Sequence, residues 1–273
     1  MIQPTQEQLQ GLTPIERFWF RIANFVLLYF RPVSIVWNQI FMVHFSWLLT
    51  GRRIRRWGLE NTEALGPESC VVVVANHRSF FDFYVIGPIL YTRTKLSKHI
   101  LFPVRAPFFY DKWVGGFINA IMSGFFMFPP VMRAKEKRAY NNYALQRMIA
   151  ELERPGQQLG IHPEGTRGKG DDPYTFLRTQ PGVGTILCKS KHTVALPVFI
   201  TGLTNSMGEE LRRNWLCKPD EHPIDVVFGP VVHFDDLRAE GDRLAIQMRI
   251  AQRCMEAVGE QAQWHKRRFV GEE

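Results

Sequence analysis

The chain has 273 residues and a formal net charge of +8, with 34 Lys or Arg against 26 Asp or Glu. Apolar residues make up 45% of it, which excludes a disordered or collagen-like protein and is enough for a sizeable core. The positive charge indicates an anionic partner: nucleic acid, a phosphorylated metabolite or an acidic membrane surface.

The N-terminal fifty residues contain two long apolar stretches. Residues 18–30 are interrupted only by Arg21 and Asn24, and residues 32–51 contain no Asp, Glu, Lys or Arg. The second stretch has the length of a bilayer-spanning helix. Three polar residues near its middle weaken that interpretation, namely Asn38, Gln39 and His44.

Two short helices that fold back at Arg31-Pro32 and lie in one leaflet fit the same pattern. A pair of buried helices of a soluble protein is the alternative. Residues 52–57, with four arginines and a tryptophan, then predict an anchor for anionic lipid headgroups, although such a run is often only a solvated face. We therefore predict membrane-associating helices over residues 1–56 and one α/β domain over residues 57–273.

From residue 57 onward, short apolar runs alternate with helical patterns. The strand-like runs are 69–75, 100–104, 125–128, 158–161, 194–200 and 224–228. Helices are expected over 80–90, around Leu145 to Leu152, and over about 242–261. This alternation predicts an α/β fold with a mostly parallel central sheet flanked by helices. The apolar segment 114–128 fits either packed core or a groove for an acyl chain.

The first candidate site follows the first of these strands. His77 stands at the predicted turn, and Asp82 comes five residues later in the first turns of the next helix. A carboxylate there can accept a hydrogen bond from one imidazole nitrogen and leave the other to take a proton from a hydroxyl. Ser79 is expected to cap the helix. A plain capping turn with a surface histidine is the alternative.

The second candidate site, residues 162–170, also follows a predicted strand. Gly165 and its neighbouring glycines permit close approach of a ligand, Arg167 offers a planar donor fork for a phosphate, and Lys169 adds charge. The segment lacks the glycine and lysine spacing of a nucleotide-binding loop, so nucleoside triphosphates are disfavoured. An ordinary glycine-rich turn is the alternative.

Together the two segments resemble a known family. Asn76-His77 to Asp82 is similar to the N-H-x-x-x-x-D signature of the glycerolipid (1-acylglycerol-3-phosphate, or lysophosphatidic acid) acyltransferase superfamily, and residues 163–167 are similar to its P-E-G-T-R block. Residues 128–133 and 195–200 resemble two further blocks more weakly, and Met132 stands where the family usually has an acid. The resemblance covers roughly residues 57–235.

The resemblance implies roles for residues in both motifs. His77 would be the general base that deprotonates the acceptor hydroxyl, and Asp82 would orient it. The acceptor site would be formed by Glu164, Gly165, Thr166, Arg167 and Arg133, with the two arginines on the acceptor phosphate. Acyl-CoA or acyl-ACP is the co-substrate, and no metal or organic cofactor is implied. The chain departs from the family at His162, where Phe is usual, and at residues 180–182, where a Lys is usual.

The resulting hypothesis is a membrane-associated O-acyltransferase of phospholipid biosynthesis that acylates a lysophospholipid, most simply lysophosphatidic acid. Its expected partners are the acceptor, the acyl thioester donor, which includes acyl carrier protein, and an anionic membrane surface. Nucleic acid is not expected, because no nucleic-acid-binding signature accompanies the charge. Residues 1–11 lack the features of a cleaved signal peptide. Because arginines follow the apolar segment at residues 52–56, a membrane location on the cytoplasmic face, monotopic or single-span, is expected. The alternatives are acylation of another lysolipid, such as a lyso-ornithine lipid or a remodelled phospholipid, and a non-catalytic lipid-binding protein.

Overall fold

The computed structural model describes residues 2–132, 134–168, 170 and 172–271. These residues form one five-stranded sheet with the order β1-β5-β4-β2-β3, in which β4 and β5 are antiparallel and the other neighbours are parallel. The strands are β1 (Ile54–Trp57), β2 (Val71–Ala75), β3 (Gln158–Ile161), β4 (Val194–Thr201) and β5 (Ile224–Phe228). The mostly parallel α/β fold is therefore confirmed.

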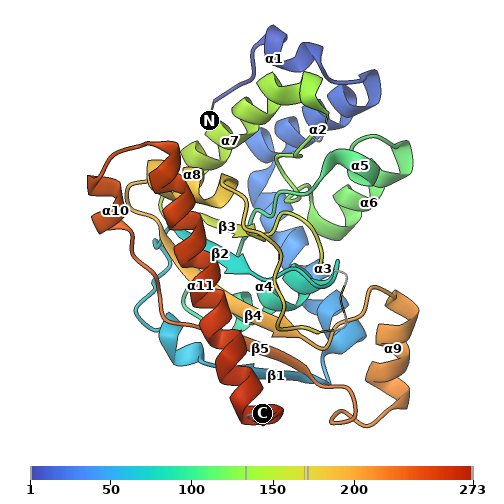
Figure 1. Ribbon diagram of the computed structural model, residues 1–273. Helices are drawn as coiled ribbons and strands as arrows, with labels where there is room; N and C mark the ends of the chain where they lie inside the picture. Colours follow the sequence, from blue (N-terminus) through green and yellow to red (C-terminus); the bar gives the residue numbers. More distant parts are fainter. Residues whose placement is uncertain (1, 133, 169, 171, 272–273) are drawn as a thin grey trace.

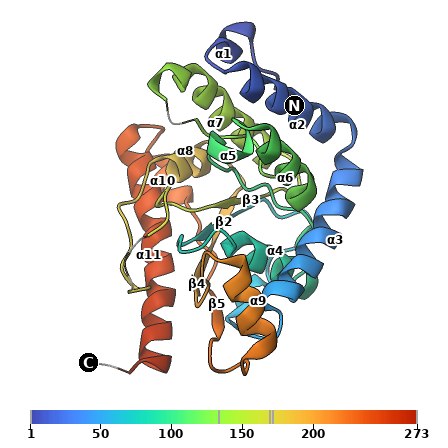
Figure 2. The same cartoon turned by 90° about the vertical axis from the view of Figure 1, so that its right-hand side faces the viewer.

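Helices cover both faces of this sheet (Figures 1 and 2). On one face lie α8 (Gly182–Lys189) and α11 (Leu244–Phe269), and on the other lies α4 (Asp82–Arg93). The predicted helix around Leu145 is part of α7 (Arg138–Leu152). The shorter elements are α1 (Gln6–Gln10), η1 (Leu59–Thr62), α5 (Ala106–Phe109), α6 (Trp113–Ser123), η2 (Lys135–Lys137), α9 (Met207–Leu216) and α10 (Asp235–Ala239).

The central strands are buried on both faces, as their continuous apolar sequence predicts. Every residue of β2 is buried, and its Val73 lies opposite Gly160 of β3 and Leu196 of β4. Gly160 leaves room for the ring of Phe83, because a Cβ atom there would lie 2.5 Å from it. The parallel arrangement of β2, β3 and β4 brings the loops after these strands to one edge of the sheet, where functional groups gather in such folds.

The N-terminal helices differ from the predicted folded-back pair. The helices α2 (Pro14–Tyr29) and α3 (Arg31–Thr50) are joined by a bend at Phe30, and α3 runs on along the side of the molecule (Figure 2). The reason is that α3 packs against α4, α6 and α9. Its polar Asn38 is buried there, donating to the carbonyl oxygen of Ser123 at 3.0 Å and accepting from the hydroxyl of Tyr91 at 3.0 Å.

Two of the predicted strands are absent from the sheet that the described residues form. Residues 100–104 and 125–128 are irregular segments that are mostly buried, and the first of them makes one isolated bridge, between Leu101 and Leu159. Pro103 lacks an N–H donor for a ladder, and Phe125 has a φ angle of 66°, which is outside the extended region. Apolar runs in these places pack into the core without strand pairing.

The arginine-rich segment after α3 contains strand β1, and two of its four arginines pair with carboxylates of the protein. Arg53 forms an ion pair with Glu210 in which both side chains are 0% exposed, and Arg55, whose side chain is 39% exposed, pairs with Asp225 at 2.6 Å. Arg52 and Arg56 are exposed, and the role of the segment as a lipid anchor stays a prediction. Since β1 begins at Ile54, it lies across the predicted division between residues 56 and 57, which stays a prediction.

Candidate active site

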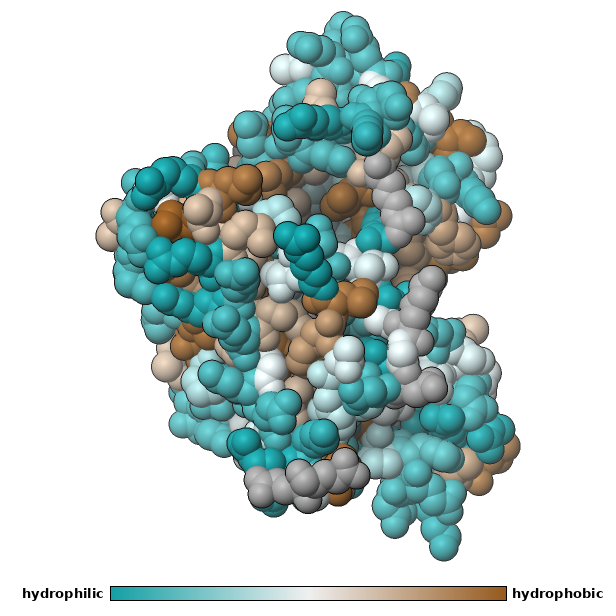
Figure 3. Space-filling view, in the orientation of Figure 1, coloured by the Kyte–Doolittle hydropathy of each residue, from teal (hydrophilic) through white to brown (hydrophobic). Residues whose placement is uncertain are grey.

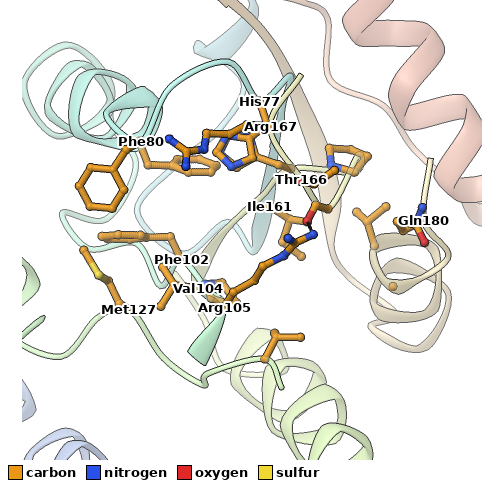
Figure 4. A pocket seen from close by; sticks show the side chains of 18 of the residues that line it. His77, Phe80, Phe102, Val104, Arg105, Met127, Ile161, Thr166, Arg167 and Gln180 are labelled. Carbon is orange, nitrogen blue, oxygen red and sulfur yellow. Dashed lines mark hydrogen bonds between the residues drawn. The ribbon is translucent and has the colours of Figure 1, made fainter. Parts of the chain in front are cut away.

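A cavity of about 1170 Å³ opens beside the loops that follow β2 and β3. Figure 3 shows the corresponding face hollowed near its centre, with hydrophobic residues inside the hollow. His77 from the first motif and Thr166 and Arg167 from the second line the cavity together with apolar residues (Figure 4). The structure thus brings the two sequence motifs to one site.

His77 and Asp82 form the hydrogen-bonded pair that their spacing predicts. Nδ1 of His77 lies 3.0 Å from Oδ2 of Asp82, and the Asp82 side chain is only 1% exposed. The same carboxylate accepts the backbone N–H groups of Arg78 and Ser79, at 3.0 to 3.1 Å. Asp82 is thereby fixed at the first turn of α4, and it directs the imidazole of His77.

The predicted capping role of Ser79 is wrong. The N-cap position of α4 is Phe81, and the hydroxyl of Ser79 donates to the carbonyl oxygen of Thr204. Because Asp82 already accepts the first free N–H groups of this turn, the serine is left to tie the turn to the loop after β4.

The hydrogen bond to Asp82 also sets the protonation of the imidazole. A carboxylate accepts, so His77 donates through Nδ1–H and keeps its lone pair on Nε2. Burial, reinforced by the positive charge of Arg167, lowers the pKa of His77 to about 3. Burial raises the pKa of Asp82 to about 6. His77 is therefore a neutral base at neutral pH.

A second histidine lies against the first. The rings of His77 and His162 are stacked with centroids 3.8 Å apart and 6° between their planes. Nδ1 of His162 donates to the carbonyl oxygen of Ala75 at 3.0 Å, and its Nε2 lies 3.9 Å from Oδ2 of Asp82. Burial lowers the pKa of His162 to about 3 as well.

These three side chains bring nitrogen and oxygen atoms within 4.8 Å of one another, which is a spacing that metal sites also have. The geometry suits proton transfer better than metal binding. Parallel rings direct their lone pairs side by side instead of toward a common point, and Nδ1 of each histidine is already engaged in a hydrogen bond.

The second motif is bound to the first through backbone groups. Gly165 has a φ angle of 63° in a turn whose N–H donates to the carbonyl oxygen of His162 at 2.9 Å. The buried carboxylate of Glu164 accepts the N–H groups of His77 at 3.3 Å and Leu177 at 3.4 Å. Gly168 donates to the carbonyl oxygen of His77 at 2.9 Å. Glu164 therefore holds the two loops together, and its predicted contact with the acceptor stays a prediction.

Three arginines among the described residues line the cavity, and Arg78 is one of them, with its guanidinium group donating to the carbonyl oxygen of Gly170. Arg167 is exposed and donates to Oδ1 of Asn205 at 2.7 Å. Arg105 donates to the carbonyl oxygen of Gly165, which places its charge across the cavity from His77 (Figure 4). The predicted ligands Arg133 and Lys169 lie outside the described residues.

Apolar side chains form the rest of the walls. One group is aromatic apart from Met127 and contains Phe80, Phe83, Tyr84, Phe102, Phe109 and Met127. The other group is aliphatic and contains Val104, Leu145, Met148, Ile161, Val183 and Ile186. Of the segment 114–128, Met127 lines the cavity, while Gly116 is pressed against Trp19 and Phe117 is on the surface. Most of that segment therefore packs against the rest of the protein or lies on the surface, and one of its residues lines the cavity.

Sequence reasoning gave no role to two asparagines that shape the site. The amide of Asn76 exchanges hydrogen bonds with the backbone of Ile200 at 2.8 and 2.9 Å, which joins the ends of β2 and β4. Asn205 accepts from Arg167 and from the N–H of Phe80. Asn76 could have been recognised from the sequence because it adjoins His77. For Asn205, the one feature of the sequence that marks it is its position after a predicted strand.

The backbone N–H groups at the start of α4 already have hydrogen-bond partners. The N–H groups of Arg78 and Ser79 donate to Asp82, that of Phe80 to Asn205, and that of Phe81 to the hydroxyl of Ser79. These four donors are engaged within the protein. Side-chain donors on the cavity wall include Thr166 and Arg167.

Comparison with known proteins identifies the family of the chain. The family model described as Acyltransferase matches residues 53–201. This match spans more than half of the chain, and the chain belongs to that acyltransferase family, as its two motifs predict.

Among solved structures, the chain is similar to the 1-acyl-sn-glycerophosphate (LPA) acyltransferase PlsC from Thermotoga maritima. The two share 16% sequence identity with a TM-score of 0.45, and the match covers 92% of this chain and 97% of that one. No curated protein matches the sequence.

Proposed function

We propose that the protein is a membrane-associated O-acyltransferase that moves a fatty acyl group from acyl-CoA or acyl-ACP to the free hydroxyl of a lysophospholipid. The simplest acceptor is 1-acylglycerol-3-phosphate, which would give phosphatidic acid. The observation that carries the proposal is the pairing of His77 with Asp82 at the wall of a cavity that also holds arginines and long apolar surfaces.

The chemistry follows from the tautomer of His77. Nε2 takes the proton of the acceptor hydroxyl as its oxygen bonds to the thioester carbonyl carbon. The tetrahedral intermediate then re-forms its C=O bond and breaks the C–S bond, and the thiolate takes the proton from His77 to leave as a thiol. Asp82 stabilises the imidazolium that exists between these steps, without itself leaving its backbone hydrogen bonds.

The acceptor phosphate is assigned to the arginine side of the cavity. Guanidinium groups bind phosphate oxygens through paired N–H donors, and Arg105 and Arg167 both line the cavity that His77 faces. Arg167 also lowers the pKa of His77, so a bound phosphate that offsets its charge makes His77 a stronger base when the acceptor is present. Thr166 is the donor we assign to the oxyanion.

Membrane association is supported by the outer surface of the N-terminal helices. Among the described residues, α3 is the one helix whose length and apolar composition would suit a membrane span. Its inner face is packed on the α/β body, while its outer face exposes apolar side chains, including Val33, Val36, Trp37, Ile40 and Trp47. Four more are exposed on α6, namely Trp113, Val114, Phe117 and Ile121.

A helix with one face on the protein and the other apolar suits a position flat on the bilayer better than a span across it. Figure 3 shows hydrophobic residues at the edge of the molecule over α5 and α6, close to the hollowed face. In this orientation, the lipid acceptor would enter the cavity from the membrane side, and the monotopic arrangement is the one we propose.

Activity with a panel of acceptors tests the proposed function. Purified protein in detergent is incubated with an acyl thioester and one lysolipid at a time, and release of the free thiol is followed together with the lipid product. We expect the largest release with lysophosphatidic acid. Release with another lysolipid alone would show that this lysolipid is the acceptor. No release with any acceptor would contradict the enzymatic function and favour a non-catalytic lipid-binding protein.

A further inference from the structure

His162 is the residue of the site to which the proposed mechanism gives no role. It follows strand β3 directly, lines the cavity, and presents the flat face of its ring to His77. The two rings are almost parallel at 3.8 Å between centroids, so they are in van der Waals contact across their faces.

The ring of His162 is itself held on two other sides. Its Nδ1–H donates to the carbonyl oxygen of Ala75 at the end of β2. The ring of Phe83 lies against it with centroids 4.7 Å apart at 48°, and Phe83 rests in turn over Gly160 of β3. His162 is thus tied to two central strands and to helix α4, which makes it a fixed surface.

His77 needs such a surface because Asp82 holds it along one edge only. The hydrogen bond from Nδ1 to Oδ2 fixes one atom of the ring. Rotation of the ring about its Cβ–Cγ bond, within the range that this hydrogen bond tolerates, would move Nε2 out of line with the acceptor hydroxyl. A flat contact over the face of the ring removes this rotation. Burial lowers the pKa of both histidines to about 3, so two neutral rings stack without charge repulsion.

We propose that His162 is a positioning residue, and that the face of its ring holds His77 in the plane in which Nε2 points into the cavity. The inference rests on the proposed function in one respect, namely that His77 is the general base. It assigns the effect to the flat face of the ring and not to its nitrogen atoms.

Two variants of similar size separate these contributions. His162→Phe keeps a flat ring and removes the nitrogens, whereas His162→Leu fills the space without a flat face. We expect the Phe variant to keep kcat within about threefold of wild type and the Leu variant to lose about tenfold or more, with KM changed by less than about twofold in both. His162→Met replaces the Leu variant if the latter does not fold.

The nitrogen NMR signals of ¹⁵N-histidine-labelled protein report the same role independently of activity. We expect the Nδ1–H tautomer for His77 in all three proteins, because Asp82 is present in each, with sharp ring signals in wild type and in His162→Phe and exchange-broadened ring signals in His162→Leu. Equal kcat values for the Phe and Leu variants, whether both are high or both are low, would overturn the proposal, as would sharp His77 ring signals in the Leu variant.

Failure of this inference can be told apart from failure of the proposed function. If His77→Ala is inactive while His162→Leu is fully active, His77 remains the base and only the role of His162 is lost. If His77→Ala itself is fully active, the general-base role fails and His162 has no base to position.

Discussion

The imidazole of His77 donates to a carboxylate of Asp82 that is already held by two backbone N–H groups, at 3.0 Å in each case for Oδ2. The direction of the imidazole is therefore set by the start of helix α4 and not by a flexible side chain. Substitution of either His77 or Asp82 should therefore reduce the rate of acyl transfer.

Asp82→Asn should abolish most of the activity. The amide oxygen can still accept a backbone N–H, but an amide that also donates cannot reliably accept Nδ1–H of His77, so the wrong tautomer becomes populated. We expect kcat to fall by about 10²- to 10⁴-fold with little change in KM. Steady-state kinetics checks this, and a loss below about tenfold would remove the orienting role of Asp82.

The same variant should gain stability relative to wild type as the pH rises. Burial raises the pKa of Asp82 from 3.8 to about 6 in the folded protein, so the unfolded chain ionises first and charging the carboxylate costs stability as the pH rises through this window. Urea unfolding at about pH 4 and about pH 7 measures the effect. We expect the free energy of unfolding of the Asn variant to rise relative to that of wild type by up to about 3 kcal/mol between these two pH values.

Arg167→Gln should change the pH dependence as well as acceptor binding. The base must be unprotonated and its orienting carboxylate ionised. Burial together with Arg167 lowers the pKa of His77 to about 3, whereas burial raises the pKa of Asp82 to about 6 although the charge of Arg167 opposes this rise. The acid limb of wild-type activity is therefore expected to follow the pKa of Asp82. Without the guanidinium charge that pKa rises, and the acid limb of kcat/KM should move to higher pH. KM for a phosphate-bearing acceptor should increase about tenfold or more.

Arg56→Gln is the matched control for this prediction, because Arg56 is an exposed arginine on strand β1, away from the cavity. It removes the same charge from the chain as a whole. Equal shifts of the acid limb in both variants would show a general charge effect and would contradict the assignment of Arg167.

Arg53→Met should destabilise the fold without touching the cavity. The variant leaves the carboxylate of Glu210 buried without its ion-pair partner, and such a loss costs about 3 to 5 kcal/mol in the free energy of unfolding. Adding Glu210→Gln removes the buried charge and should recover at least half of this. If the double variant were less stable than Arg53→Met, the ion pair would not be the cause.

The exposed apolar face of α3 should control binding to vesicles. Val33 and Ile40 are 65% and 53% exposed, so Val33→Asp with Ile40→Asp should leave the fold intact and weaken sedimentation with anionic vesicles by about tenfold or more. Leu244→Asp is the control, since Leu244 is 66% exposed on α11 on the opposite side of the molecule (Figure 2). Equal losses in both proteins would contradict a specific membrane face.

Much of the fold could be predicted because its determinants are local in the sequence. The run that forms β2 is wholly apolar and the stripe of α11 is regular, and both elements form where expected. Strand β1 was missed because its two middle residues, Arg55 and Arg56, are both charged. Only the distant partners Glu210 and Asp225 explain why Arg53 and Arg55 lie at this place in the fold. Irregular segments such as 125–128 were missed because burial alone does not make a strand.

The candidate site shows the same division. His77 and Asp82 lie within one turn, so their spacing in the sequence was enough to predict the contact. The stack of His77 on His162 and the hydrogen bond from Arg167 to Asn205 join loops far apart in the chain. Those contacts depend on the register of the sheet, which sequence periodicity does not report.

The most direct test of the account is the rate of acyl transfer by His77→Ala. The assay measures thiol release from an acyl thioester with lysophosphatidic acid, and His192→Ala, which removes an exposed histidine outside the cavity, is the control. We expect His77→Ala to lose at least about 10²-fold in kcat while His192→Ala keeps wild-type activity. Wild-type kcat in His77→Ala would contradict the proposed general base.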